Sequence, residues 1–167
     1  AGAEYGIRGW LHSTNLADGS KNWRTYTIPA PDEPGGDTWK QGPEAHSKDA
    51  WMHGGGSTWV VGSYDPDLDV IYWGVGNPGP DWDNEYRPGD NLFTNSSVAI
   101  DMDTGEKKWH FQYTPGDYLD YDEVGIQLLM DVEINGEERK VLSHFGRNGI
   151  FYTLDRTNGA YIQSGQY

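Results

Sequence analysis

Short apolar runs, separated by glycine and proline, set the pattern of this chain. Residues 59–64 and 70–74 are two such runs, and they flank the turn Asp65-Pro66-Asp67. Alternating apolar strands around a Pro/Asp turn are typical of a β-hairpin. Residues 131–135 and 138–144 predict a second hairpin around Asn135-Gly136, a dipeptide that favours a type I′ turn. Residues 28–50 and 78–92 have no periodicity and are expected to be loops.

A turn pattern recurs along the chain. Each copy has a polar side chain four residues before a glycine, and the first two copies have tryptophan four residues after it. The copies are Asn15/Gly19/Trp23, Asp101/Gly105/Trp109 and Asp155/Gly159/Gln163. Repeats of this kind mark propellers and solenoids, with about 40–50 residues per propeller blade. The sequence therefore predicts an all-β fragment of about two to three blades, since a closed propeller takes about 4–8.

Composition narrows the class of protein. The chain has 167 residues, with 23 Gly, 8 Trp and 11 Tyr but no Cys, and a net charge of −14. The aromatic content argues against disorder, and the acidic charge disfavours nucleic acid and anionic membrane surfaces. Without Cys, disulfides and thiolate metal sites are excluded. No run is apolar enough to span a bilayer, so no membrane span is expected.

Oxygen-bearing side chains suggest a metal site. If residues 120–122 are extended, Asp120 and Asp122 point the same way and share one face. With Glu4 and Asn77 they form an all-oxygen set that suits a hard cation. The alternative is a solvated acidic turn, which the spacing alone favours.

A glycine run suggests close approach to a ligand. Gly54-Gly55-Gly56 precede Ser57-Thr58-Trp59, so backbone and a flat indole could approach the same group. Taken alone, the stretch favours the alternative, a tight turn with a core tryptophan.

Together these motifs resemble one family, the alcohol dehydrogenases that use pyrroloquinoline quinone, including methanol dehydrogenase large subunits. The motifs, in family order, are Gly2-Ala3-Glu4, Gly55-Gly56-Ser57-Thr58-Trp59, Tyr72-Trp73-Gly74-Val75-Gly76-Asn77-Pro78, Arg87-Pro88-Gly89-Asp90-Asn91, Asp120-Tyr121-Asp122 and Gly146-Arg147-Asn148-Gly149. The resemblance spans essentially residues 1–167 and implies part of a single eight-bladed β-propeller domain. It also implies that the Gly/Trp repeat is a tryptophan-docking motif tying each blade to the next.

The resemblance implies a role for each matched residue. Glu4, Asn77 and Asp120 match the metal ligands, and Asp120 also matches the proposed catalytic base. Asp122 matches the extra carboxylate of lanthanide-dependent members, so a lanthanide(III) is favoured over Ca²⁺. For the quinone, Gly2, Ala3 and Ser57 match polar contacts and Trp59 matches the ring that stacks beneath it. Arg147 matches the guanidinium beside the reactive oxygens, with a catalytic and a cofactor-binding role.

Function and location follow from the same resemblance. They are the oxidation of small primary alcohols to aldehydes by hydride transfer to the metal-activated quinone, with cytochrome c as electron acceptor, in the periplasm. A homodimer of the full-length protein is possible. Gly116 stands where the family pattern has histidine, which puts the support of that loop in doubt. The alternative is a non-catalytic propeller scaffold, which would need the docking repeat but not Trp59 or Arg147.

Overall fold

The computed structural model describes residues 5–43 and 45–167. Its strands are β1 (Trp10–Thr14), β2 (Lys21–Tyr26), β3 (Ser63–Asp65), β4 (Val70–Gly74), β5 (Ser96–Asp101), β6 (Lys107–Gln112), β7 (Leu128–Ile134), β8 (Glu137–Phe145), β9 (Ile150–Asp155) and β10 (Tyr161–Gln166). The 3-10 helices η2 (Gly36–Thr38) and η3 (Ala45–His53) lie between β2 and β3.

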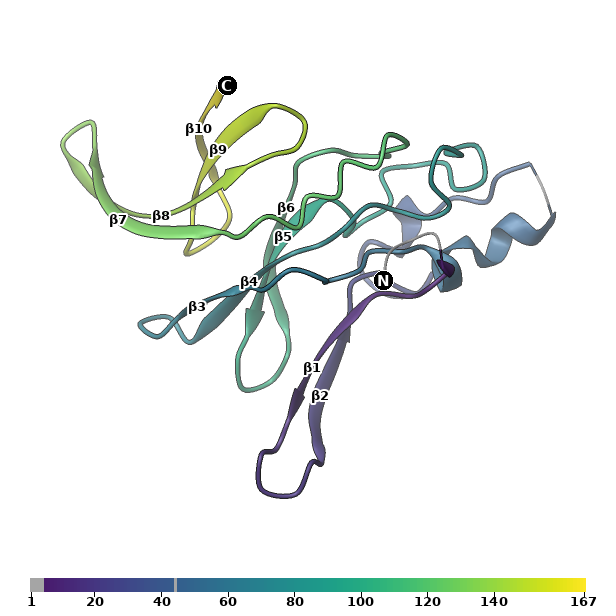
Figure 1. Ribbon diagram of the computed structural model, residues 1–167, viewed down its shortest axis with the longest axis horizontal. Coiled ribbons are helices and arrows are strands. Elements are labelled where there is room, and N and C mark those ends of the chain that lie inside the picture. The colour runs from purple at the N-terminus through teal and green to yellow at the C-terminus, as the bar shows by residue number, and fades with distance from the viewer. Residues whose placement is uncertain (1–4, 44) are drawn as a thin grey trace.

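In the described part of the chain, the strands form three antiparallel sheets (Figure 1). The hairpin β1-β2 stands alone, and two four-stranded meanders follow in the orders β3-β4-β5-β6 and β7-β8-β9-β10. The meanders approach each other where β3 lies beside β7. Two complete blades and one hairpin agree with the predicted fragment of two to three propeller blades.

Local predictions are confirmed in part. The turn at Asn135-Gly136 has positive φ at both residues, 55° and 83°, as a type I′ turn requires. The first predicted hairpin forms, but its first strand spans only Ser63–Asp65 instead of 59–64. At Gly62, just before this strand, the ring of Trp73 occupies the space that a Cβ would need. The predicted loop at 28–50 contains η2 and the first part of η3, which continues to His53.

Apolar side chains fill the spaces between neighbouring sheets. Between the two meanders lies a buried cluster to which both sheets contribute. It consists of Val70, Tyr72, Ala99, Tyr113, Leu142, Tyr152 and Leu154. Between the first hairpin and the first meander, the cluster is Leu11, Val75, Phe93, Val98 and Ile100. The protein therefore has its core between blades, face to face, as in a propeller.

The repeated turns are the docking points between sheets. Trp23 of β2 packs on Gly105, and its indole Nε1 donates to the carbonyl of Met102, 3.0 Å away. Trp109 of β6 packs in the same way on Gly159. Each tryptophan thus docks on the glycine turn of the next copy, and a Cβ at Gly159 would lie 2.6 Å from the Trp109 ring.

A buried arginine adds a polar connection between the two meanders. Nε of Arg156, just after β9, donates to Oδ2 of Asp65 in β3 at 2.6 Å, and its Nη1 donates to Oδ1 of Asp131 at 2.6 Å. The hydroxyl of Tyr72 donates to the Arg156 carbonyl. Burial raises the pKa of Asp65, but the hydrogen bond and charge of Arg156, together with the backbone N–H groups of Asp67 and Leu68, lower it, and the net shift is downward.

The docking contact predicts a cost for adding one methyl group. Gly159→Ala places Cβ against the Trp109 ring, and overpacking of this kind costs about 1–3 kcal/mol. Gly136→Ala is the matched control, because Gly136 has a similar positive φ of 83° and nothing within 4 Å of the added Cβ. Urea unfolding of the full-length protein should show the larger loss for Gly159→Ala. Equal losses would mean that strain of the backbone, and not docking, explains both.

The Asp65–Arg156 pair predicts a pH dependence. Asp65 has a lower pKa in the folded than in the unfolded state, so its stabilising effect is complete above the unfolded pKa and is lost as the pH falls through the folded pKa. Removing one partner of a buried pair costs about 3 kcal/mol. Asp65→Asn should therefore destabilise the protein at neutral pH, and the difference should shrink below about pH 4. Thermal unfolding across pH measures it, and a pH-independent difference would contradict the assignment.

Candidate functional site

Three loop segments meet at one side of the sheets, where Figure 1 shows the long connections gathered. The backbone of Gly56 donates to the carbonyl of Asn77 at 3.0 Å, and Gly76 donates to the carbonyl of Ser57 at 2.8 Å. Gly55 and Gly56 have φ of 76° and 61°, which glycine adopts without strain. The glycine run and the Asn77 segment are therefore held side by side.

Asp122 is the centre of this cluster. Its Oδ2 accepts a hydrogen bond from the Trp59 indole at 2.9 Å, and its Oδ1 accepts the backbone N–H of Asn77 at 3.3 Å. An Arg147 guanidinium nitrogen lies 3.8 Å from Oδ2. Burial raises the pKa of Asp122, and the charge of Asp120 adds to the rise. The site therefore holds a desolvated carboxylate, which a cation would stabilise.

The predicted extended conformation at residues 120–122 is wrong. Asp120 and Asp122 have φ of 57° and 56°, in the left-handed region. The cause is Asp117, whose buried carboxylate accepts the backbone N–H groups of Leu119 at 2.7 Å and Tyr121 at 2.8 Å and turns the chain. Asp120 and Asp122 are near each other because of this turn and not because of strand alternation.

Asn77 lies next to Asp122 and is hydrogen-bonded to the 78–81 loop. Asn77 is buried, and its side-chain nitrogen donates to the Asp81 carboxylate and to the carbonyl of Pro78. These bonds assign the nitrogen end of the amide to the 78–81 loop. Carboxylate and amide oxygens are the ligands that a hard cation takes.

Ser57 and Trp59 provide the features expected of a surface for a flat, polar ligand. Ser57 is buried, and its Oγ has no hydrogen-bond partner among the described residues. A buried hydroxyl without a partner costs free energy unless a ligand or water satisfies it. The Trp59 side chain is 56% exposed although its indole N–H is fixed by Asp122. An exposed, oriented indole beside an unsatisfied hydroxyl fits a ring-shaped cofactor with polar substituents.

Glu123 was not found from the sequence, and it supports the turn that carries Arg147. It is fully buried, and its Oε2 lies 2.9 Å from His144 Nε2 and accepts the backbone N–H of Arg147 at 2.9 Å. Its Oε1 accepts the N–H of Asn148 at 3.4 Å. Glu123 directly follows Asp122, so one segment serves both the carboxylate cluster and the Arg147 turn. The signal available in the sequence was only a carboxylate next to a candidate ligand.

The remaining predicted site residues, Gly2, Ala3 and Glu4, lie outside the described residues. The chain just after them contacts the site, because Gly55 N–H donates to the carbonyl of Ile7 at 2.9 Å. Within residues 5–43 and 45–167, no three His, Cys, Asp or Glu side chains form a group able to hold a metal ion. The predicted ligand set needs Glu4 as its third carboxylate.

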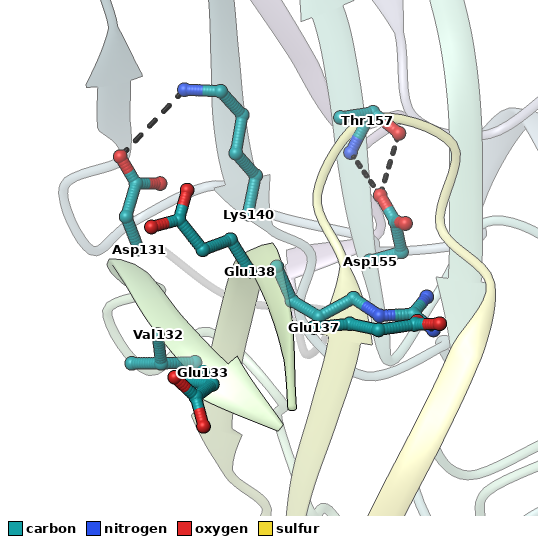
Figure 2. A pocket seen from close by; sticks show the side chains of 9 residues that line it. Asp131, Val132, Glu133, Glu137, Glu138, Lys140, Asp155 and Thr157 are labelled. Carbon is teal, nitrogen blue, oxygen red and sulfur yellow. Dashed lines mark hydrogen bonds and ion pairs between the residues drawn. The ribbon is translucent and has the colours of Figure 1, made fainter. Parts of the chain in front are cut away.

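A cavity of about 970 Å³ lies elsewhere, on the β7-β8 hairpin (Figure 2). It is lined mainly by charged side chains, including Asp131, Glu138 and Lys140, and by none of the predicted site residues. Lys140 is paired with Asp131 at 3.7 Å and with Asp67 at 3.2 Å. Five of the lining side chains are acidic and two are basic, and none belongs to the predicted site, so this cavity is not the candidate site.

Comparison with known proteins assigns the fold and family. Residues 5–164 match the family model described as the glucose/ethanol/alcohol dehydrogenase β-propeller domain with pyrroloquinoline quinone. The chain belongs to this family. No helix in the described residues has the length and apolar character to cross a bilayer.

Individual relatives agree with the family. The chain is 41% identical to the putative dehydrogenase XoxF of Paracoccus denitrificans, over 100% of this chain and 30% of that protein. It is 40% identical to a quinohemoprotein alcohol dehydrogenase of Comamonas testosteroni, over 98% and 24%. The crystal structure of a quinohemoprotein alcohol dehydrogenase from C. testosteroni matches with a TM-score of 0.90 and 37% identity, over 100% of this chain and 26% of that one.

A solved europium-containing methanol dehydrogenase also matches, with a TM-score of 0.90 and 34% identity over 100% of this chain and 31% of that one. The chain therefore spans about a third or less of the relatives named here.

Proposed function

We propose that the chain is a part of a pyrroloquinoline-quinone-dependent alcohol dehydrogenase that carries its metal ligands and several of its quinone contacts. In this proposal, residues 1–167 belong to one propeller domain, and the protein oxidises small primary alcohols to aldehydes. The observation that supports it most is the cluster around Asp122. This carboxylate is buried, contacts Trp59 and faces Arg147, beside the unsatisfied hydroxyl of Ser57.

The cluster distinguishes an enzyme from a scaffold propeller. A scaffold requires only the packing of Trp23 on Gly105 and Trp109 on Gly159. It gains nothing from burying Asp122, because desolvating a carboxylate costs free energy. The cost is consistent with a site that a cation completes.

The proposed metal ligands are Glu4, Asn77, Asp120 and Asp122, for a lanthanide(III) or Ca²⁺. Two neighbouring carboxylates in 120–122 favour the trivalent ion, because a higher charge offsets more of their mutual repulsion. When bound, pyrroloquinoline quinone polarised by the metal would supply a carbonyl carbon able to accept hydride from the alcohol.

The protein side chains have distinct roles in the proposed reaction. Asp120 would accept the hydroxyl proton of the alcohol, and the alcohol, having lost hydride to the quinone, would leave as the aldehyde. The guanidinium of Arg147 would stabilise negative charge that develops on the reactive oxygens of the quinone. Trp59 presents a flat face to the cofactor, and Gly2, Ala3 and Ser57 bind its polar substituents.

Electron acceptor and location complete the proposal. The name of a relative, methanol dehydrogenase [cytochrome c] subunit 1 of Methylorubrum extorquens, includes cytochrome c, and that protein is 40% identical over 98% of this chain. We extend this to cytochrome c as acceptor and to the periplasm as location. A homodimer of the full-length protein is part of the same proposal.

A metal-dependent activity assay tests the proposed function. The full-length protein is loaded with quinone and either La³⁺ or Ca²⁺, and dye-linked oxidation of ethanol is measured. Activity is expected with La³⁺. Asp122→Ala should reduce it by about 100-fold, because it removes a carboxylate from the metal. Glu138→Ala is the control, since it removes an exposed carboxylate from the β7-β8 cavity.

Each other outcome has a defined meaning. Equal activity with Ca²⁺ in the parent and in Asp122→Ala would remove Asp122 from the metal site. A loss in Glu138→Ala as large as in Asp122→Ala would contradict the location of the site. A full-length protein without quinone binding and without activity would support the scaffold alternative.

A further inference from the structure

Asn95 is a fully buried polar residue that lies immediately before β5 and outside the predicted ligand set. Its φ is 48°, a left-handed conformation that asparagine adopts more readily than most residues. Its backbone N–H donates to the carbonyl of Gly76 at 3.1 Å, and its carbonyl accepts the N–H of Tyr113 at 2.8 Å. Through Gly76, Asn95 is tied to the segment that carries Asn77.

The side chain of Asn95 reaches the other half of the site. Its Nδ2 donates to Oδ2 of Asp117 at 2.7 Å, and its Oδ1 accepts the backbone N–H of Glu123 at 3.3 Å. These two residues are the ends of the segment that contains Asp120 and Asp122. One amide therefore bridges the base of that loop.

The loop needs such support because it has no β-ladder. None of residues 117–123 belongs to a strand. Asp120 and Asp122 both have left-handed φ, a conformation that persists only when the surroundings fix it. The contacts that fix it begin at Asp117, which holds the N–H groups of Leu119 and Tyr121.

We infer that Asn95 is a positioning residue of the metal site, setting the distance between the Asn77 segment and the carboxylates of Asp120 and Asp122. The inference rests on the proposed function, because a positioning role requires that a metal binds at this site. Groups that orient metal ligands without touching the metal typically contribute about 10–100-fold to metal affinity. Asn95 is placed to do so for ligands on two separate segments.

Two substitutions remove the bridge in different ways. Asn95→Gly deletes the side chain and keeps the left-handed backbone without strain. Asn95→Asp keeps the size and the acceptor but loses the donor to Asp117, and it places two carboxylates against each other. Neither substitution changes a proposed ligand.

The readout is terbium(III) binding to the full-length protein, followed by tryptophan-sensitised luminescence. Both variants should bind terbium about 10–100-fold more weakly than the parent. Asp65→Asn is the matched control, because it breaks a buried polar contact between the meanders and makes no contact with the site. It should lower the unfolding temperature and leave the terbium dissociation constant unchanged.

The outcomes separate the two proposals. If the parent binds terbium and both Asn95 variants bind it within about twofold, Asn95 has no positioning role. If Asp65→Asn weakens terbium binding as much as they do, the effect is general destabilisation and the inference is again overturned. A parent that binds no terbium would overturn the proposed metal site itself, and with it the role of Asn95.

Discussion

The burial of carboxylates in one short segment is the constraint on which this part of the structure depends. Asp117, Asp122 and Glu123 are each less than 10% exposed. A buried anion is tolerated when hydrogen bonds or opposite charge compensate it. Asp117 is compensated by backbone N–H groups and Asn95, and Glu123 by His144 and the Arg147 turn. Asp122 receives hydrogen bonds only from Trp59 and from the N–H of Asn77, with a guanidinium nitrogen of Arg147 at 3.8 Å, and burial raises its pKa.

The propeller sheets allow this arrangement because the docking contacts that hold them together do not involve the 117–123 loop. The docking of Trp109 on Gly159 and the hydrogen bonds of Arg156 hold the two meanders together without using residues 117–123. The loops between strands are then free to bury polar groups against one another. The site is built on rigid sheets but from residues with irregular backbone, as functional sites often are.

The sequence predicted the fold through features with a fixed spacing. The repeat that ends in Trp23 and Trp109 predicted blades, and the structure confirms that each indole docks on the following glycine turn. Asn135-Gly136 predicted its hairpin because a type I′ turn requires positive φ at both central residues, which Asn and Gly adopt readily. The alternation argument failed at residues 120–122, since a hydrogen-bonded turn and not a strand brings Asp120 and Asp122 together.

The site was predicted through resemblance, and its supports were not predicted at all. Glu123, His144 and Asn95 have no spacing signal, because their partners come from segments 20 or more residues apart. Such contacts depend on how the loops fold over one another, which periodicity does not describe. The β7-β8 hairpin also carries several carboxylates, of which Glu137 is paired with Arg139 and Asp131 with Lys140 at the surface.

The central claim is that the desolvated carboxylate of Asp122 is completed by a cation. Anomalous X-ray diffraction from crystals of the full-length protein grown with quinone and a lanthanide(III) tests it most directly. The account predicts a metal peak within about 2.6 Å of oxygens from Asn77, Asp120 and Asp122, the range of such ligand distances. A peak elsewhere, such as the β7-β8 hairpin, or a fully occupied metal that Asp122 does not touch, would contradict it.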